Sequence, residues 1–137
     1  DSGWPGMKVL EFAFDAREPS NYLPHTYERN CICYTGTHDN DTTAGWYANI
    51  PEECRDKIRR YGNTDGGCIS LDFIRFCMGS IAKYAIFPIQ DLLQLGSEAR
   101  MNTPGVAADN WAFRYETHDL TPDRASWLFQ TTKLFGR

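Results

Sequence analysis

The chain has 137 residues, of which 42% are hydrophobic and 23% charged, which indicates one folded domain with a core and excludes a disordered chain. Its 14 Lys and Arg and 18 Asp and Glu give a net charge of −4 with no long basic run, so nucleic acid is not an expected partner. Apolar runs stay short of the about 18 residues that a membrane-spanning helix needs, so no membrane contact is expected.

The five cysteines indicate a reducing compartment. Their number is odd, no Cys-x-x-Cys pair occurs, and Cys31, Cys33 and Cys77 sit in apolar runs, where cysteine behaves as a small hydrophobic residue. No signal peptide is recognisable, so we expect a cytoplasmic protein. The chain starts without Met, close to an apolar run, and we expect it to be a piece of a longer protein.

The first half of the chain predicts two strands and a short helix. A strand-like run covers residues 7–14, and the prolines of 15–30 indicate an irregular loop. A short apolar strand is expected at 31–35. Thr42 or Thr43 is then expected to cap a helical turn that continues to Tyr47.

Two longer helices follow. Pro51 at the start, two acidic residues after it and Gly62 at the end predict a helix whose buried stripe is Cys54, Ile58 and Tyr61. The periodicity of residues 69–83 predicts the second helix. Because apolar residues recur on one side of each segment, both helices are expected to pack on a sheet.

The last third predicts one more strand, a loop and a helix. Residues 85–89 form an apolar strand that Pro88 should end, and 96–105 form a polar loop. A helix capped by Thr121 is expected to close the chain, with an apolar face of Ala125, Leu128, Phe129 and Phe135. Strands that alternate with helices favour a parallel α/β sheet, and three strands are too few for a closed barrel.

The polar run His38-Asp39-Asn40-Asp41 follows the second strand. In strand register one face is shared by Cys31, Cys33, Thr35, Thr37 and Asp39. Inside a barrel that face would be the lumen, with Asp39 at its rim. Two alternatives stay open: an Asx-type turn with a helix cap, and a metal site of His38, Asp39 and Asp41.

Other candidate site residues have a structural interpretation beside the functional one. Gln90 and Asp91 are either polar groups of a pocket at the end of the third strand or a helix cap. Trp4, Trp46 and Trp111 are either platforms for sugar rings or core residues.

Several segments together resemble one enzyme family. They are Pro5–Phe14 (PGMKVLEFAF), Tyr22–His25 (YLPH), Tyr34–Thr42 (YTGTHDNDT), Phe87–Gly105 (FPIQDLLQLGSEARMNTPG) and Asn110-Trp111. The chain resembles the 4-alpha-glucanotransferases (amylomaltases, disproportionating enzymes) of glycoside hydrolase family seventy-seven, in the alpha-amylase superfamily.

The resemblance implies a (β/α)8 TIM barrel. Residues 1–137 would be a single segment, the carboxyl-terminal part of the catalytic barrel domain with about strands six to eight and their helices. Of three family carboxylates only the last, after the seventh strand, maps here, onto Asp39. His38 would bind sugar hydroxyls, Asn102 would lie in a substrate-contacting loop, and Gln90 and Asp91 would lie at the rim of the eighth strand. No cofactor and no metal are implied.

The implied activity is transfer of 1,4-alpha-glucan segments between maltooligosaccharides by a retaining double displacement. The nucleophile and the acid/base would lie upstream, in a missing amino-terminal part of the same enzyme, so we expect this chain to be inactive alone. Two alternatives belong to other classes. One is a noncatalytic carbohydrate-binding or interaction module that uses Trp46 and Trp111, and the other is a metal-dependent hydrolase at His38, Asp39 and Asp41.

Overall fold

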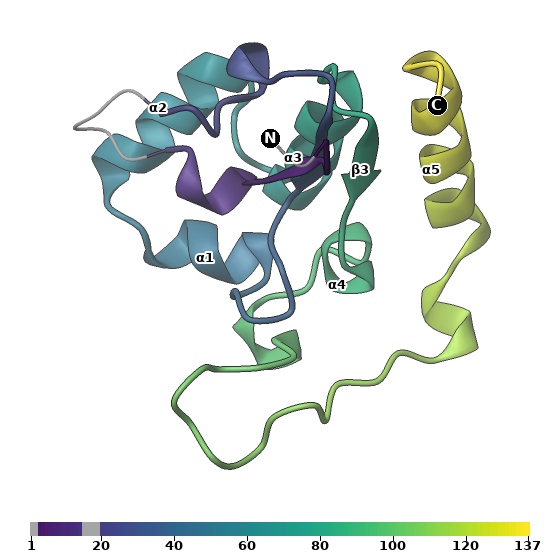
Figure 1. Cartoon of the computed structure of the whole chain (residues 1–137). Helices are drawn as coiled ribbons and strands as arrows, with labels where there is room; N and C mark the ends of the chain where they lie inside the picture. Colours follow the sequence, from purple (N-terminus) through teal and green to yellow (C-terminus); the bar gives the residue numbers. More distant parts are fainter. Residues whose placement is uncertain (1–2, 15–19) are drawn as a thin grey trace.

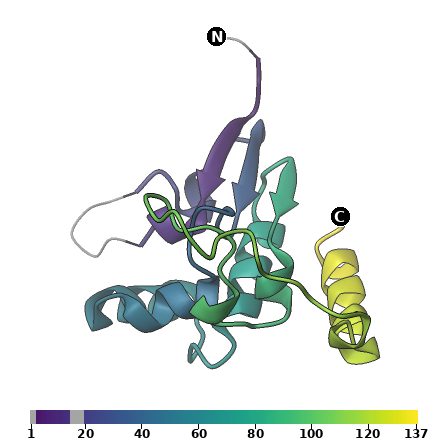
Figure 2. The same cartoon turned by 90° about the horizontal axis from the view of Figure 1, so that it is seen from below.

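The computed structural model describes residues 3–14 and 20–137, so part of the loop predicted at 15–30 lies outside the described residues. Three parallel strands form one sheet in the order β1 (Gly6–Val9), β2 (Cys31–Tyr34), β3 (Tyr84–Ile86). Figure 2 shows the three arrows side by side and pointing the same way. Their carboxyl ends therefore share one edge of the sheet, as the alternation of strands and helices predicts.

Five α-helices accompany the strands in the described part of the chain. They are α1 (Thr43–Asn49), α2 (Glu52–Gly62), α3 (Ile69–Gly79), α4 (Ile89–Leu92) and α5 (Pro122–Leu134). Short 3-10 helices lie at η1 (Leu10–Phe12), η2 (Pro24–Thr26), η3 (Ser97–Ala99) and η4 (Thr117–Asp119). The predicted caps are confirmed, because Oγ1 of Thr42 accepts from Gly45 N and Oγ1 of Thr121 accepts from Arg124 N, each at 3.2 Å.

Three predicted boundaries are wrong. The first strand ends at Val9 instead of residue 14, because the chain turns into η1. The helix predicted to reach residue 83 ends at Gly79, where Ser80 takes an extended conformation. The strand predicted over 85–89 covers Tyr84–Ile86 instead, whereas the prediction that the strand ends about Pro88 is confirmed, because Pro88 has no backbone N–H and leads into α4.

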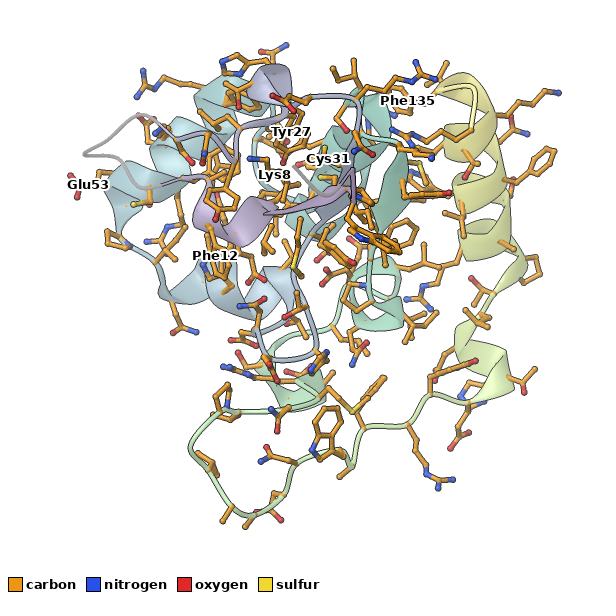
Figure 3. The ribbon with its side chains drawn as sticks, in the orientation of Figure 1. Lys8, Phe12, Tyr27, Cys31, Glu53 and Phe135 are labelled. Atoms are coloured by element: carbon orange, nitrogen blue, oxygen red, sulfur yellow. The ribbon has the colours of Figure 1, made fainter. Side chains whose placement is uncertain are left out.

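The core lies between the sheet and helices α1 to α3. Phe73 and Cys77 of α3 and Ile58 of α2 are fully buried in it together with the cysteines of β2. Figure 3 shows Tyr27 and Cys31 near each other in this interior, whereas Glu53 extends outward from α2. The predicted stripe of α2 is confirmed in part: Ile58 is fully buried and Tyr61 packs against the core, whereas Cys54 is half-buried.

The cysteine face of β2 points toward the helices, not toward a lumen. Sγ of Cys33 lies 2.9 Å from Sγ of Cys77, so a small side chain here allows α3 to approach the strand closely. The assignment of this face to a barrel lumen is wrong for the strand residues, and the strand ends at Tyr34, so its alternation does not extend to Asp39. The opposite face, with Met7, Tyr84 and Ile86, is exposed.

Helix α5 stands to one side of the molecule, at the end of a long connecting segment (Figure 1). Trp127, Leu128 and Phe135 pack against a small second core formed by Ile74, Met78 and Leu92. Two residues of the predicted apolar face, Ala125 and Phe129, are exposed instead. Within the described residues no helix is both long and apolar enough to cross a membrane.

Candidate functional site

The loop between β2 and α1 presents His38 and Asp39 at the carboxyl edge of the sheet. Oδ1 of Asn40 accepts bonds from the backbone N (2.8 Å) and Oγ1 (2.9 Å) of Thr37, which closes a tight turn. Thr42 then begins α1. The loop is therefore an Asx-type turn with a helix cap, which is one of the interpretations of the sequence. This turn leaves the side chains of His38 and Asp39 exposed.

The Asp39 carboxylate joins two of the predicted site residues. Nδ2 of Asn102 donates to Oδ1 of Asp39 at 2.7 Å, and Nε2 of His38 lies 3.3 Å from the same oxygen. Half of the Asp39 side chain stays exposed, which leaves the carboxylate accessible. The structure thus brings Asp39, His38 and Asn102 together on one surface.

Arg100 holds this group in place and was not singled out by sequence reasoning. Its Nη2 donates to the backbone oxygen of Asp39 at 2.6 Å, and its Nε donates to the backbone oxygen of Asn102 at 2.9 Å. One guanidinium therefore fixes the main chain on both sides of the Asp39–Asn102 bond. The segment Ser97–Arg100 is a conspicuous polar motif, but nothing in its spacing points to Asp39, which is 61 positions away.

An aromatic residue lies beside the group. The rings of His38 and Trp111 pack with centroids 5.3 Å apart at an interplanar angle of 37°. Next to His38, a hollow of about 330 Å³ opens toward the exposed face of the sheet and is lined mainly by apolar residues, among them Met7, Tyr34 and Ile86.

Asp91 lies inside the protein rather than at a rim. It is 1% exposed, and its carboxylate accepts from Thr35 Oγ1 (2.7 Å), Thr43 N (2.9 Å) and Thr43 Oγ1 (2.8 Å). Burial raises the pKa of Asp91, and these donated hydrogen bonds oppose the rise. These contacts favour a structural role, a clamp between the ends of the loop that carries Asp39.

Gln90 is also buried, and its Nε2 donates to the backbone oxygen of Ala99 at 3.1 Å. This bond ties α4 to η3, the segment just before Arg100. Because Gln90 and Asp91 are buried, the structure does not support the predicted contacts of these residues with substrate. Both residues instead support the loops that carry the exposed group.

Asp41 shapes the turn rather than facing a ligand. Its Oδ1 accepts from Thr42 N at 2.8 Å, and its Oδ2 accepts from Ser97 Oγ at 2.7 Å. The second bond joins the Asp39 loop to η3. Gly45 of α1 makes this approach possible, since a Cβ there would meet the Ser97 backbone N at 2.8 Å.

Glu11 is a buried carboxyl group below the loop. It is 7% exposed, and neither of its oxygens has a hydrogen-bond partner. Burial raises the pKa of Glu11 to about 9; Asp91 and Asp41 add to the rise and Arg100 opposes it. Its carboxyl group lies directly against Gly36, where a side chain would collide with it. Burial therefore favours the neutral, protonated form of Glu11.

The geometry gives little support to the metal-dependent hydrolase or to the noncatalytic carbohydrate-binding module. In the described part of the chain no three His, Cys, Asp or Glu side chains gather as metal ligands would. Trp46 packs on Phe73 in the core, with ring centroids 5.5 Å apart, so this residue is no exposed platform. Trp111 is 61% exposed.

One family model matches most of the chain. Residues 1–121 match the model of glycoside hydrolase family 77, described as 4-alpha-glucanotransferase. A 4-alpha-glucanotransferase of Synechocystis sp. is 46% identical over 136 residues, which is 98% of this chain and 27% of that protein. A 4-alpha-glucanotransferase of Solanum tuberosum, named chloroplastic/amyloplastic, is 44% identical over 111 residues, 80% of this chain and 19% of its own length.

A solved structure also matches. Amylomaltase from Streptococcus agalactiae, in complex with acarbose, superposes with a TM-score of 0.94 at 34% identity. The superposition covers 99% of this chain and 28% of that one. The chain therefore spans about a quarter of the length of the proteins that it matches.

Proposed function

The chain belongs to the 4-alpha-glucanotransferase family, glycoside hydrolase family 77, and we propose that it forms about a quarter of such an enzyme. The observation that supports this most directly is the bond between Asp39 and Asn102, with His38 beside it, at the carboxyl edge of a parallel sheet. In α/β barrels that edge carries the active site. The proposed activity is transfer of 1,4-alpha-glucan segments between maltooligosaccharides.

Strands β1 to β3 are proposed to be strands six to eight of a (β/α)8 barrel, with residues 1–137 a single segment of the catalytic domain. Helices cover one face of the sheet, and the other face carries exposed apolar side chains such as Met7 and Ile86. A barrel interior would cover such a face. The match to an amylomaltase over 28% of its length supports this proposal.

Asp39 is proposed to hold hydroxyl groups of the sugar ring at the reacting centre and to favour its distortion toward an oxocarbenium-like transition state. Retaining chemistry requires a nucleophile and an acid/base about 5 Å apart. We propose that the nucleophile and the acid/base belong to the rest of the enzyme, outside this chain. This chain alone would then be inactive. Asn102 and Arg100 would orient the Asp39 carboxylate, and His38 would add a further hydrogen bond to the sugar.

The proposed partners are maltooligosaccharides and the remaining part of the enzyme. The complex of the Streptococcus agalactiae amylomaltase with acarbose supports an oligosaccharide-type ligand. The proposed location is a reducing compartment such as the cytoplasm, because all five cysteines are free thiols. The potato relative is chloroplastic/amyloplastic by name.

The test uses the full-length enzyme that carries this chain, with maltotriose as the only substrate. Transfer yields glucose together with longer oligomers, which chromatography separates. Asp39→Asn is expected to reduce turnover by about 1,000-fold or more, since a charge stabilising the transition state is lost. Asp123→Asn, an exposed carboxylate in the first turn of α5, is the matched control. Glucose without longer products, or near-normal turnover of Asp39→Asn, would contradict the proposal.

A further inference from the structure

Trp111 is an exposed indole held in an unfavourable backbone conformation. Its φ is +60°, in the left-handed region that bulky residues rarely adopt. Trp111 is 61% exposed, so packing within this chain does not explain its position. Strain of this kind persists only where the surroundings enforce it, and it concentrates at functional sites.

Hydrogen bonds hold the loop that carries Trp111. The backbone N of Trp111 donates to the backbone oxygen of Met101 at 2.7 Å. Oδ1 of Asn110 accepts from Thr103 N at 2.9 Å, and Nδ2 of Asn110 donates to the Val106 oxygen at 2.6 Å. The segment from residue 101 to 111 is thus closed on itself, and its two ends carry Asn102 and Trp111. The indole is positioned before any ligand arrives.

The indole lies next to the polar group described above. One part of its ring packs on His38, whose Nε2 is 3.3 Å from the Asp39 carboxylate that Asn102 also contacts. An exposed aromatic surface beside a carboxylate, an amide and an imidazole matches the chemistry of a pyranose ring. The apolar C–H face of such a ring packs on an aromatic plane, and its hydroxyls bond to the polar side chains.

We propose that Trp111 is a substrate-binding platform that stacks on one glucose ring of the glucan beside Asp39 and thereby sets the preferred glucan length. This inference rests on the proposed transferase function and deepens it. Trp111 binds the substrate and takes no part in bond breaking. The imidazole of His38 supports the indole from one side, so the two rings form one binding wall.

The test compares Trp111→Ala and Trp111→Phe in the full-length enzyme over a series of maltooligosaccharides from maltotriose to maltoheptaose. Trp111→Ala is expected to raise KM about 10-fold with less than about 3-fold change in kcat, because one stacking contact is lost. Phe keeps a flat ring and should retain most of the affinity. Trp4→Ala removes an exposed indole at the amino end of β1, opposite the site, and should change neither constant.

Chain-length dependence separates a platform from a structural residue. In the wild type, one step of the series should raise kcat/KM where the added glucose reaches Trp111, and this step should be absent in Trp111→Ala. An unchanged KM and an intact length dependence would overturn the inference, as would a lowered Tm with normal KM, since either would make Trp111 a packing residue. If the wild type fails to make longer oligomers, the proposed function itself fails, which is a different outcome.

Discussion

Asn102 donates a hydrogen bond to the carboxylate of Asp39 at 2.7 Å, although the two residues are 63 positions apart in the sequence. The bond joins the loop after β2 to the loop after η3, and Arg100 fixes the backbone of both residues. The amide leaves the other carboxylate oxygen free to bind a ligand.

Removing the Asn102 amide should impair activity more than stability. Asn102→Ala leaves Asp39 without its side-chain donor, so the carboxylate loses its orientation, and kcat/KM for maltotriose should fall about 10-fold to 100-fold. The residue lies at the surface, so the Tm should change by less than about 2 °C. Asn30→Ala, which removes an exposed amide at the amino end of β2, serves as the control. Equal activity of the two variants would contradict the role of Asn102.

Loss of the Asp91 carboxylate should destabilise the protein. Asp91→Ala would leave the Thr35 hydroxyl and the Thr43 N–H and hydroxyl buried without an acceptor, at a cost of about 2–4 kcal/mol. Thr43→Val removes only one donor and should cost about 1 kcal/mol. Thermal and urea unfolding of the full-length enzyme measure both. If Asp91→Ala lowered kcat/KM without lowering stability, the predicted substrate contact of Asp91 would be favoured over the clamp.

Glu11 should make stability depend on pH. The pKa of Glu11 is raised from 4.5 to about 9, so between these values the folded protein binds more protons than the unfolded chain, and stability falls as the pH rises through this window. Glu11→Gln has no ionisation penalty and should be more stable than the wild type at pH 8, by up to about 4–5 kcal/mol. At pH 4 the two should unfold alike.

The measurement is the Tm of the wild type and of Glu11→Gln from pH 4 to pH 9. Glu53→Gln, an exposed glutamate on α2, should follow the wild-type curve. An identical pH dependence of wild type and Glu11→Gln would show that Glu11 ionises freely in the folded state.

Gly45→Ala should be destabilising even though alanine usually favours a helix by about 1 kcal/mol over glycine. The added Cβ would meet the Ser97 backbone at 2.8 Å and would separate Ser97 from Asp41. We expect a loss of about 1–3 kcal/mol and a weaker activity, since η3 leads directly to Arg100. Gly6→Ala, with nothing within 4 Å of its Cβ, is the control, and a stabilised Gly45→Ala variant would refute the tight packing of α1 on η3.

Local signals in the sequence predict the elements well. Thr42 and Thr121 cap helices as their polar side chains indicate, and the alternation of strands and helices predicts a parallel sheet. Boundaries are less accurate, because Leu10 and Phe12 suit a strand as well as the turn of η1 that they adopt. The apolar face of α5 differs from the predicted one because Phe129, despite its hydrophobic ring, lies on the side away from α3 and α4.

Contacts between distant residues explain the remaining differences. A strand with small side chains such as Cys31 and Cys33 fits a barrel lumen or a closely packed helix equally well, and only the position of Cys77 distinguishes these cases. Asp91 has the same local sequence whether it lies at a rim or is enclosed by Thr35 and Thr43. The position of His38 and Asp39 after a strand indicates them as site candidates, and Asn102 follows from the family resemblance. Arg100, which holds Asp39 and Asn102, carries no local signal of its role.

The clamp at Asp91 determines when the loop can form during synthesis. Asp91 bonds to Thr35 and Thr43, the two ends of the loop with Asp39, so this loop is closed only after a residue 48 positions beyond its second end has left the ribosome. Until then Thr35 and Thr43 of the nascent chain lack the Asp91 carboxylate that accepts their hydrogen bonds. The loop can therefore reach its final shape only once α4, with Asp91, has emerged from the ribosome.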